Sequence, residues 1–476
     1  MFFRFIIITL LLTSQTKALE SGLIQDFAKT SPFKHKVRPR KVNLNEVIEQ
    51  GLRENFDQHI REFSSATIQI DIQDTKSDFW VPKLKLELIT APQKLATLRE
   101  GSKNTSSTSK EPAGSFGLTF EDYTVFNWGK DFLQYQSNIA SLEREKDSLK
   151  EERRELKLDL IKAYFKLYSV KEMQKIYRAQ LQKASFVYRL NREKVVLKKI
   201  TKQDYYQSRS EYFRTQTEYY EAQKSSESVD EEITRIISDR AGTRYIPEDL
   251  LVFKEISLPI KEALKISVIN NPDVLDIKTN LKNAKRDYEI KLKENLPLPK
   301  ISVALGTWAH RFEAGRSSTR YETSPGNSDI ELVATINASW PLTGSGGILN
   351  TRNTRRSLIQ TRKFEKTLDG KIHTVQSLIR DYYQRILNYE NQIKFLQERS
   401  KNIDKALDII IDNYLLRKAN FTDFSSILVE FRESKIDYIK ALYNHLELKI
   451  ELSKLLGLEN FPGESFENLA KKRIIQ

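Results

Sequence analysis

The sequence predicts a mostly α-helical α+β fold made of two pseudo-repeats, each combining a long helical hairpin with two β-strands. The first observation behind this prediction is an internal duplication, in which Val42–Leu88 lines up with Leu258–Leu305. Within these segments Val81-Pro82-Lys83 corresponds to Leu298-Pro299-Lys300. A duplicated unit of this size is typical of a pseudo-symmetric wall rather than of a single active-site cleft. We place the first repeat at residues 42–250, the second at 251–460 and a short C-terminal tail at 461–476.

The second observation is that two long spans contain almost no glycine or proline. Neither residue occurs between Gly129 and Gly242, and between Pro341 and Pro462 there is no proline and, away from the two ends, only Gly370. Both spans therefore permit nearly uninterrupted helix. Leucines that recur at sevens, as at Leu142, Leu149 and Leu156, indicate coiled-coil packing. We predict long helical hairpins over 129–238 and 347–456.

Helix lengths then constrain the architecture. The long helix of the first hairpin spans roughly 105 Å at 1.5 Å per residue, and a single helix over about 46–77 together with one over about 204–238 matches that length when stacked end to end. The second repeat gives the same sum with helices over about 262–294 and 423–456. The predicted hairpin tips contain Thr201 and Thr422 as caps of the returning helices, and Asn420 as a residue that tolerates a left-handed conformation.

The third observation is strict alternation of apolar and polar residues in four short segments, at about 83–91, 115–123, 300–310 and 329–340. This pattern predicts strands with one apolar and one polar face. It fits a membrane β-barrel with a wet lumen, but a soluble sandwich gives the same alternation. All four tryptophans, Trp80, Trp128, Trp308 and Trp340, lie in or beside these strands, where interfacial aromatic girdles are expected. Tryptophans of a soluble core are the alternative.

The N-terminus predicts export. Residues 1–18 contain one early charge, an apolar run and small residues that suit cleavage near Ala18, so we interpret them as a signal peptide. Residues 19–41 form a lead-in. The chain has no cysteine, and therefore no disulfide and no acceptor for a lipid anchor. Four strands cannot close a transmembrane barrel, because an open sheet edge in lipid leaves backbone groups unpaired. The sequence therefore predicts oligomerisation, and three copies would supply twelve strands.

Several motifs resemble those of the TolC family of outer-membrane efflux and secretion channels. They are the repeated helix opening before Asn-Pro or Asn-x, the Pro-x-hydrophobic entry to the first strand, the FNWGK and WPLTGSGG turns, and YNHLELKIELSKLLG at 443–457. The resemblance covers nearly the whole mature chain twice over. It implies a homotrimer with a 12-stranded barrel in outer-membrane lipid, continued by a periplasmic α-helical barrel. It also implies a Gram-negative-type envelope, a periplasmic adaptor and an inner-membrane transporter, as in tripartite efflux or type I secretion.

The same resemblance directs attention to acidic residues at the tips and to glycines at the sheet. Family channels narrow at acidic rings on the returning tip helix, and Asp423 and its counterpart Asp204 occupy that zone. Repeated in a trimer, such carboxylates favour cations. A helix N-terminal acid stabilised by the helix dipole is the alternative for each. Family members often carry glycine at the tip turn and this chain does not. Gly129, Gly344, Gly346 and Gly347 are predicted strand-to-helix turns.

Composition excludes several other functions. The formal net charge is +14, but most Lys and Arg alternate with Glu and Asp along helices, which predicts solvated surface and no nucleic-acid binding. The five histidines are scattered without metal-ligand spacing. We therefore predict no enzymatic activity, no metal and no cofactor. The competing hypothesis is an exported coiled-coil structural or adhesive envelope protein.

Overall fold

The computed structural model describes residues 39–90, 114–312, 331–340, 342–343, 348–416 and 418–472. The predicted signal peptide and most of the lead-in lie outside these ranges. The elements of the first repeat are α2 (Leu44–Glu54), α3 (Phe56–Trp80), β2 (Leu84–Thr90), β3 (Gly114–Phe126), α4 (Lys130–Val196) and α5 (Lys202–Ile236). Those of the second, in the same order, are α6 (Ile260–Asn270), α7 (Pro272–Glu294), β6 (Lys300–Phe312), β7 (Glu331–Ser339), α8 (Thr351–Leu415) and α9 (Phe421–Leu456).

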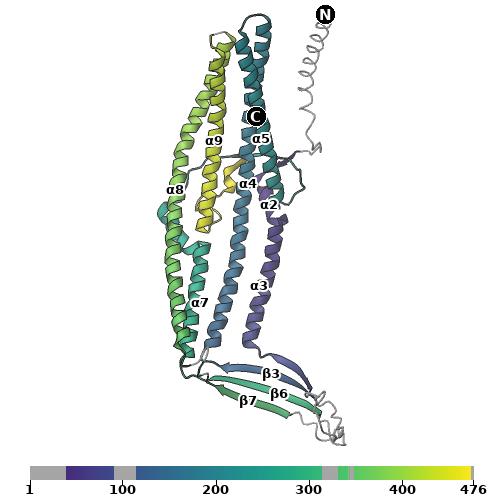
Figure 1. Ribbon diagram of the computed structural model, residues 1–476, viewed down its shortest axis with the longest axis vertical. Helices are drawn as coiled ribbons and strands as arrows, with labels where there is room; N and C mark the ends of the chain where they lie inside the picture. The colour runs from purple at the N-terminus through teal and green to yellow at the C-terminus, as the bar shows by residue number, and fades with distance from the viewer. Residues whose placement is uncertain are drawn as a thin grey trace, which may run out of the picture.

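The long helices run side by side along the longest axis of the molecule, with two hairpin turns at one end and the sheet at the other (Figure 1). Helices α5 and α3 follow one another along α4, and α9 and α7 follow one another along α8. Because α4 also packs against α7 and α9, the helices form an array with α3 and α5 at one edge and α8 at the opposite edge.

The helices that precede the sheet are broken, so the predicted single helices over about 46–77 and 262–294 are wrong. Asn55 and Asn271 have extended backbones, with ψ of 129° and 126°, and their side-chain oxygens cap the helices that follow. The Asn55 amide donates to Ile236 O at 2.7 Å and the Asn271 amide donates to Leu455 O at 2.8 Å. A duplicated asparagine therefore ends one helix, starts the next and fastens it to the last turn of the helix stacked above it.

One antiparallel sheet joins the two repeats. Its strand order is β2-β3-β6-β7, so the central pair brings together one strand from each repeat. Leu84 lies opposite Phe120 in the β2–β3 pair, and Ile301 lies opposite Ala338 in the β6–β7 pair. Among the described residues, β2 and β7 each pair on one side only. The sheet is therefore open at both edges.

Short strands form a belt midway along the helices. β1 (Arg40–Val42) pairs in parallel with β4 (Tyr245–Pro247), and β5 (Asp249–Leu251) pairs with β8 (Ala470–Lys472). The C-terminal residues from 461 to 472 are therefore folded onto the helices and are not a free tail. Phe461, Phe466 and Leu469, the last in a 3₁₀ turn, are at most 4% exposed.

The main hydrophobic core lies at the level of this belt. It surrounds the middle of α4, where Leu158, Leu160, Tyr164 and Phe165 are fully buried. Gly51 lets α2 approach this helix, because a Cβ built there would lie 2.3 Å from Leu160 Cδ2. A second core, nearer the tips, joins α4, α8 and α9 around Phe424 and Leu428. The two cores make the helical part of the molecule one packed body.

Candidate functional sites at the hairpin tips and the sheet end

The turn between α4 and α5 is a Schellman motif with a lysine at its left-handed position. Lys198 has a φ of 53°, its N–H donates to Val195 O at 3.1 Å, and the N–H of Lys199 donates to Lys194 O at 2.8 Å. Glycine is the usual residue here, because Cβ crowding costs an L-residue about 1–2 kcal/mol. Thr201 then caps α5, since its Oγ1 accepts from the Asp204 N–H at 3.0 Å.

The second tip is capped by Asn420 and not by Thr422. The Asn420 side chain accepts from the Asp423 N–H at 2.8 Å, and the Asp423 carboxylate accepts from the Asn420 N–H at 3.2 Å, which completes a capping box. Thr422 is the second residue of α9, so its predicted capping role is wrong: asparagine two residues earlier takes it. Asn420 is also extended, with φ −90° and ψ 172°, and not left-handed.

Both tip carboxylates serve the starts of their helices. Asp204 and Asp423 are each the third residue of a returning helix, and Asp204 Oδ2 accepts from the Thr201 hydroxyl at 2.7 Å. This is the capping geometry that the sequence offered as the alternative to a pore-lining role. Asp423 is nevertheless exposed and Asp204 half-buried, so neither is sealed from solvent.

A cleft of 480 Å³ separates the two turns. Tyr414 lines the cleft, and its hydroxyl donates to Asn191 Oδ1 at 2.7 Å and so ties α8 to α4. Burial raises the pKa of Tyr414. The lining comes from both hairpins and includes three lysines, with one carboxylate: Lys194, Lys198, Lys199, Ile200, Thr201, Asp204, Tyr414, Ala419, Asn420 and Phe421.

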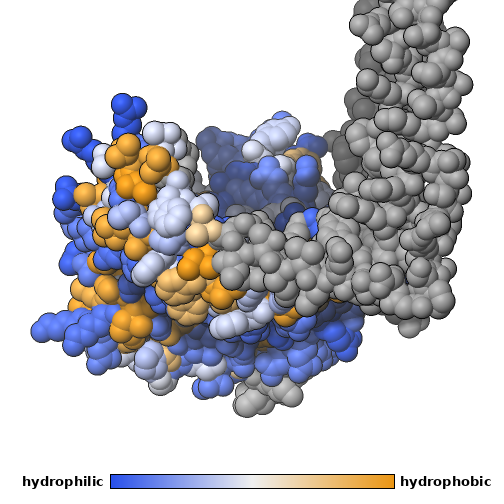
Figure 2. Space-filling model, turned by 90° about the horizontal axis from the view of Figure 1, so that it is seen from below, coloured by the Kyte–Doolittle hydropathy of each residue, from blue (hydrophilic) through white to orange (hydrophobic). Residues whose placement is uncertain are grey.

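The sheet end carries exposed aromatic and aliphatic side chains where the helices meet the strands. Trp80 is 63% exposed and Trp340 50% exposed, and the Trp128 indole donates to Pro299 O at 3.1 Å. Trp308 lies within β6, but its side chain is outside the described part. Figure 2 shows hydrophobic patches beside hydrophilic surface at this end of the molecule. The exposed apolar residues here include Trp80, Val81, Leu84, Val125, Phe126, Trp128, Trp340 and Leu342.

A sharp bend turns β3 into α4. Trp128 and Gly129 are both left-handed, with φ of 54° and 76°, and the N–H of Lys130 donates to Asn127 O at 2.9 Å. Glycine removes the steric cost of the second left-handed residue. The corresponding glycines of the second repeat, Gly344, Gly346 and Gly347, lie outside the described residues.

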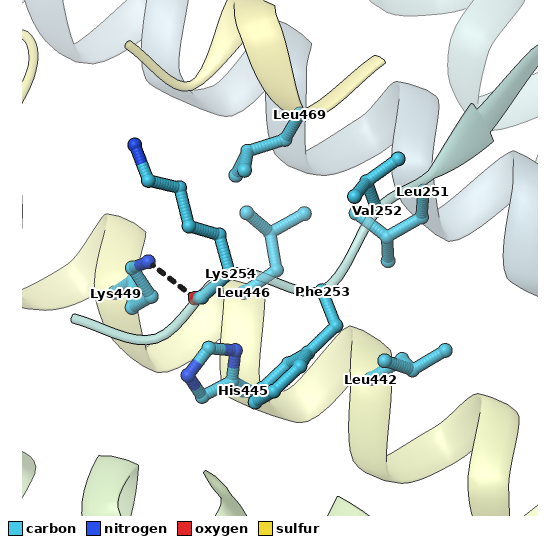
Figure 3. A pocket seen from close by; sticks show the side chains of 9 residues that line it. All are labelled: Leu251, Val252, Phe253, Lys254, Leu442, His445, Leu446, Lys449 and Leu469. Carbon is cyan, nitrogen blue, oxygen red and sulfur yellow. Dashed lines mark hydrogen bonds between the residues drawn. The ribbon is translucent and has the colours of Figure 1, made fainter. Parts of the chain in front are cut away.

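A buried polar cluster, which no sequence pattern indicated, lies at the belt on α8, α9 and the C-terminal segment. Figure 3 shows its two α9 members, His445 and Lys449, and the hydrogen bond from Lys449 to Lys254 O. His445 Nε2 lies 3.2 Å from Glu390 Oε1, which also accepts from the Ile256 N–H at 2.6 Å. Lys449 pairs with Glu464 and donates to Lys254 O at 3.1 Å. Burial lowers the pKa values of His445 and Lys449. Their spacing of four on α9 places them on one face, but only the fold reveals the partners.

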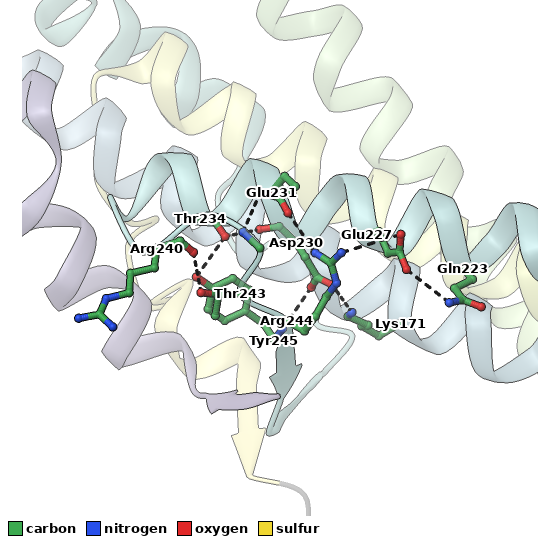
Figure 4. Close-up of polar contacts among 11 residues, drawn as sticks. Lys171, Gln223, Glu227, Asp230, Glu231, Thr234, Arg240, Thr243, Arg244 and Tyr245 are labelled. Atoms are coloured by element: carbon green, nitrogen blue, oxygen red, sulfur yellow. Dashed lines mark hydrogen bonds and ion pairs between the residues drawn. The ribbon is translucent and has the colours of Figure 1, made fainter. Parts of the chain in front are cut away.

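A second polar cluster fixes the end of α5 (Figure 4). Asp230 is fully buried, accepts from Lys171 Nζ at 2.8 Å and from the Tyr245 N–H at 3.3 Å, and lies 3.9 Å from Arg244 Nε. Burial raises the pKa of Asp230, and the hydrogen bond from Lys171 partly offsets that rise. The cluster joins α4, α5 and β4. Its role is therefore to hold the belt in place rather than to form a reaction centre.

Neither cluster has the make-up of a metal centre. Across the described ranges, no group of three or more His, Cys, Asp or Glu residues is placed to hold a metal ion. In the same part of the chain, no helix is both long and apolar enough to cross a membrane.

An elongated array of helical hairpins that ends in an open antiparallel sheet defines the channel-like class of fold that the sequence predicted. By sequence, no family model and no curated protein matches the chain. By structure, the chain is similar to the outer-membrane channel CmeC of Campylobacter jejuni, with 16% identity, coverage of 87% of this chain and 85% of that chain, and a TM-score of 0.71.

Two further solved structures have the same arrangement. VceC, an outer-membrane protein of Vibrio cholerae, is 15% identical over 89% of this chain and 96% of its own, with a TM-score of 0.67. The open state of the outer-membrane channel MtrE of Neisseria gonorrhoeae is 14% identical over 87% and 89%, with a TM-score of 0.66. The chain therefore has the TolC-like outer-membrane channel fold, which confirms the predicted mostly α-helical fold of long hairpins with few strands.

Proposed function

We propose that this protein is a trimeric outer-membrane channel that exports small molecules or proteins and has no catalytic residue. Three copies close a 12-stranded barrel in outer-membrane lipid and an α-helical barrel across the periplasm. A periplasmic adaptor and an inner-membrane transporter supply recognition and energy, in tripartite efflux or type I secretion. The signal peptide directs the chain to a Gram-negative-type envelope without a lipid anchor. The TolC-like fold supports this proposal.

The observation that carries the proposal is the open sheet. Among the described residues, β2 and β7 are edge strands that belong to the same four-stranded sheet. Each backbone N–H or C=O group left unpaired in lipid costs several kcal/mol. Pairing β2 of one copy with β7 of the next removes both edges. Twelve strands lie within the range of known transmembrane barrels.

The edges of the helical array support the same assembly. On α3, Phe56, Ile60, Phe63 and Ile70 are between 56% and 75% exposed and follow heptad-like spacing. The α5 stripe, Tyr206, Phe213 and Tyr220, repeats at sevens, and α8 exposes Phe395 and Ile409 fourteen residues apart. Apolar stripes at heptad spacing are typical of helices that pack lengthwise against a partner. A second copy of the chain provides that partner.

The trimer gives roles to the tip and sheet-end residues. We propose that Trp80, Trp128, Trp308 and Trp340 form the membrane-interface girdle. Asp423 and Asp204 are proposed to line the constriction at the tip, where rings of carboxylates favour cations. Thr201, Thr422 and Asn420 lie at or beside the same tips.

Electron microscopy of the protein extracted in mild detergent tests the assembly. We expect hollow three-fold cylinders on the order of 140 Å long, from a ~105 Å helical tube and a ~30 Å barrel. Solid rods, or a monomer that is soluble without detergent, would refute the channel. They would favour an exported coiled-coil protein instead.

Disulfide trapping between copies tests which helices meet. Within the chain, Tyr188 of α4 stacks on Tyr212 of α5 with ring centroids 5.2 Å apart, and Tyr414 of α8 bonds Asn191 of α4. These contacts fix the positions of α5 and α8 along the axis of α4. Measured along that axis, Phe213 and Ile409 are separated by about one helical turn or less. A three-fold axis along the tube preserves height, so these two residues are expected to face each other across the interface.

The chain has no cysteine, so any disulfide that forms must join the introduced cysteines. We expect the Phe213→Cys/Ile409→Cys variant to form covalent dimers and trimers on oxidation, seen on non-reducing gels. The single variants serve as controls. In a Phe213→Cys/Phe395→Cys variant, the cysteine on α8 lies about 21 Å along the helix from position 409, so this variant should not cross-link. Equal cross-linking in both double variants would contradict the α5–α8 interface.

A further inference from the structure

The hairpin tips present positive charge next to exposed apolar residues. Lys194, Lys198 and Lys199 line the cleft between the two turns, and Lys198 and Lys199 are exposed. Its one carboxylate, Asp204, accepts a hydrogen bond from the Thr201 hydroxyl at the start of α5. The cleft therefore carries an excess of positive charge.

Exposed apolar side chains flank the cleft residues in the sequence. Val196, the last residue of α4, is 77% exposed, and the C-cap residues of α4 and α8, Leu197 and Leu416, are 61% and 64% exposed. Exposed leucine and valine next to the lysines of a tip turn resemble the mixed apolar and charged surface of a docking site more than solvated helix. A surface of this composition fits a partner that brings both apolar side chains and negative charge.

The backbone of the first turn adds an independent observation. Lys198 occupies the left-handed position of the Schellman motif, where glycine would avoid a cost of about 1–2 kcal/mol. The side chain of Lys198 lines the cleft. Strained non-glycine residues of this kind concentrate at functional sites.

We propose that the tip cleft binds an acidic segment, rich in Asp or Glu and carrying aliphatic residues, on the docking end of the partner protein. The inference rests on the proposed function, which places these tips in the periplasm facing an adaptor. It adds the chemistry of recognition: the carboxylates of the partner meet Lys198 and Lys199, and its aliphatic residues cover Val196 and Leu197. Three-fold symmetry repeats the cleft around the end of the tube.

Fluorescence anisotropy with two synthetic peptides tests the charge requirement. One peptide contains Glu, Ala and Leu, and the other replaces every Glu with Lys. Both are titrated with the full chain in detergent, and binding to empty micelles is subtracted. We expect the acidic peptide to bind and to weaken at least fivefold between 50 and 300 mM salt, since the Debye length shrinks. Equal or tighter binding of the basic peptide would overturn the proposal.

Variants locate the site. Lys198→Glu/Lys199→Glu is expected to weaken the acidic peptide at least tenfold and to admit the basic one. Lys363→Glu/Lys366→Glu makes the same change of charge at exposed positions on α8 near the sheet end and is expected to leave both affinities unchanged. An equal loss in both variants would show non-specific attraction and refute the tip site.

The Lys198→Gly variant separates binding from folding. Glycine relieves the left-handed strain, so we expect higher thermal stability together with roughly threefold weaker binding of the acidic peptide. Unchanged affinity would contradict the role of Lys198. Electron microscopy of the same samples keeps the two proposals apart. Hollow cylinders that fail to bind the acidic peptide would refute the tip site and leave the channel standing, whereas failure to form cylinders would refute the channel.

Discussion

Replacing Gly457 by alanine is expected to destabilise the protein by about 3 kcal/mol or more, from left-handed strain and overpacking together. Gly457 ends α9 with φ 65°, and the N–H of Leu458 donates to Ser453 O at 3.0 Å in a Schellman motif. A Cβ built on Gly457 would lie 2.2 Å from the backbone oxygen of Asn270. That carbonyl belongs to the end of α6, so relief requires moving α6 away from α9. Circular dichroism at 222 nm should show a melting temperature lower by several degrees, or the variant should fail to accumulate.

Two other glycines separate the contributions to this effect. Gly463 has φ 77° with nothing within 4 Å of an added Cβ, so Gly463→Ala measures left-handed strain alone, at about 1 kcal/mol. Gly370 lies inside α8, also with open space, and Gly370→Ala is expected to stabilise by about 0.5–1 kcal/mol. If Gly457→Ala costs no more than Gly463→Ala, the close approach of α6 is not a constraint.

The repeated order of helices and strands could be predicted because it depends on local patterns. The absence of Gly and Pro from 130–241 permits α4 and α5, and alternation marks the strands. The helix breaks at Asn55 and Asn271 could not be predicted this way, although the two residues align in the duplication. Each break is stabilised by a carbonyl far away in the chain, on Ile236 and Leu455. Long-range partners of this kind leave no periodic signal.

The tips show the same limit at the level of single residues. Both turns could be located from the sequence, but Thr422 was predicted as the cap, and only the observed path of the chain assigns that role to Asn420. The left-handed backbone of Lys198 could not be predicted, because nothing in the sequence distinguishes it from the other lysines. The C-terminal residues appeared to be a tail because their aromatic residues, Phe461 and Phe466, are buried against elements remote in sequence.

Removing the Glu464 carboxylate is the second change with a large expected effect. The side chains of Lys449 and Glu464 form an ion pair and are 1% and 0% exposed, and the Lys449 ammonium also donates to Lys254 O. Glu464→Ala leaves that ammonium buried without its counter-charge, which costs about 3–5 kcal/mol in comparable buried pairs. We expect the melting temperature to fall and the segment from 461 to 472 to become sensitive to protease, because this pair fastens it to α9.

A double variant decides whether charge or packing holds this segment. Replacing buried ion pairs by apolar residues of similar volume is often neutral or stabilising, since desolvation of both charges is avoided. Lys449→Met/Glu464→Leu is therefore expected to recover most of the stability lost in Glu464→Ala and to restore protease resistance. Failure of the double variant to recover would mean that neighbouring groups depend on the charges. The nearest candidates are His445 and Glu390, which share the cluster and whose 3.2 Å contact relies on the same turn of α9.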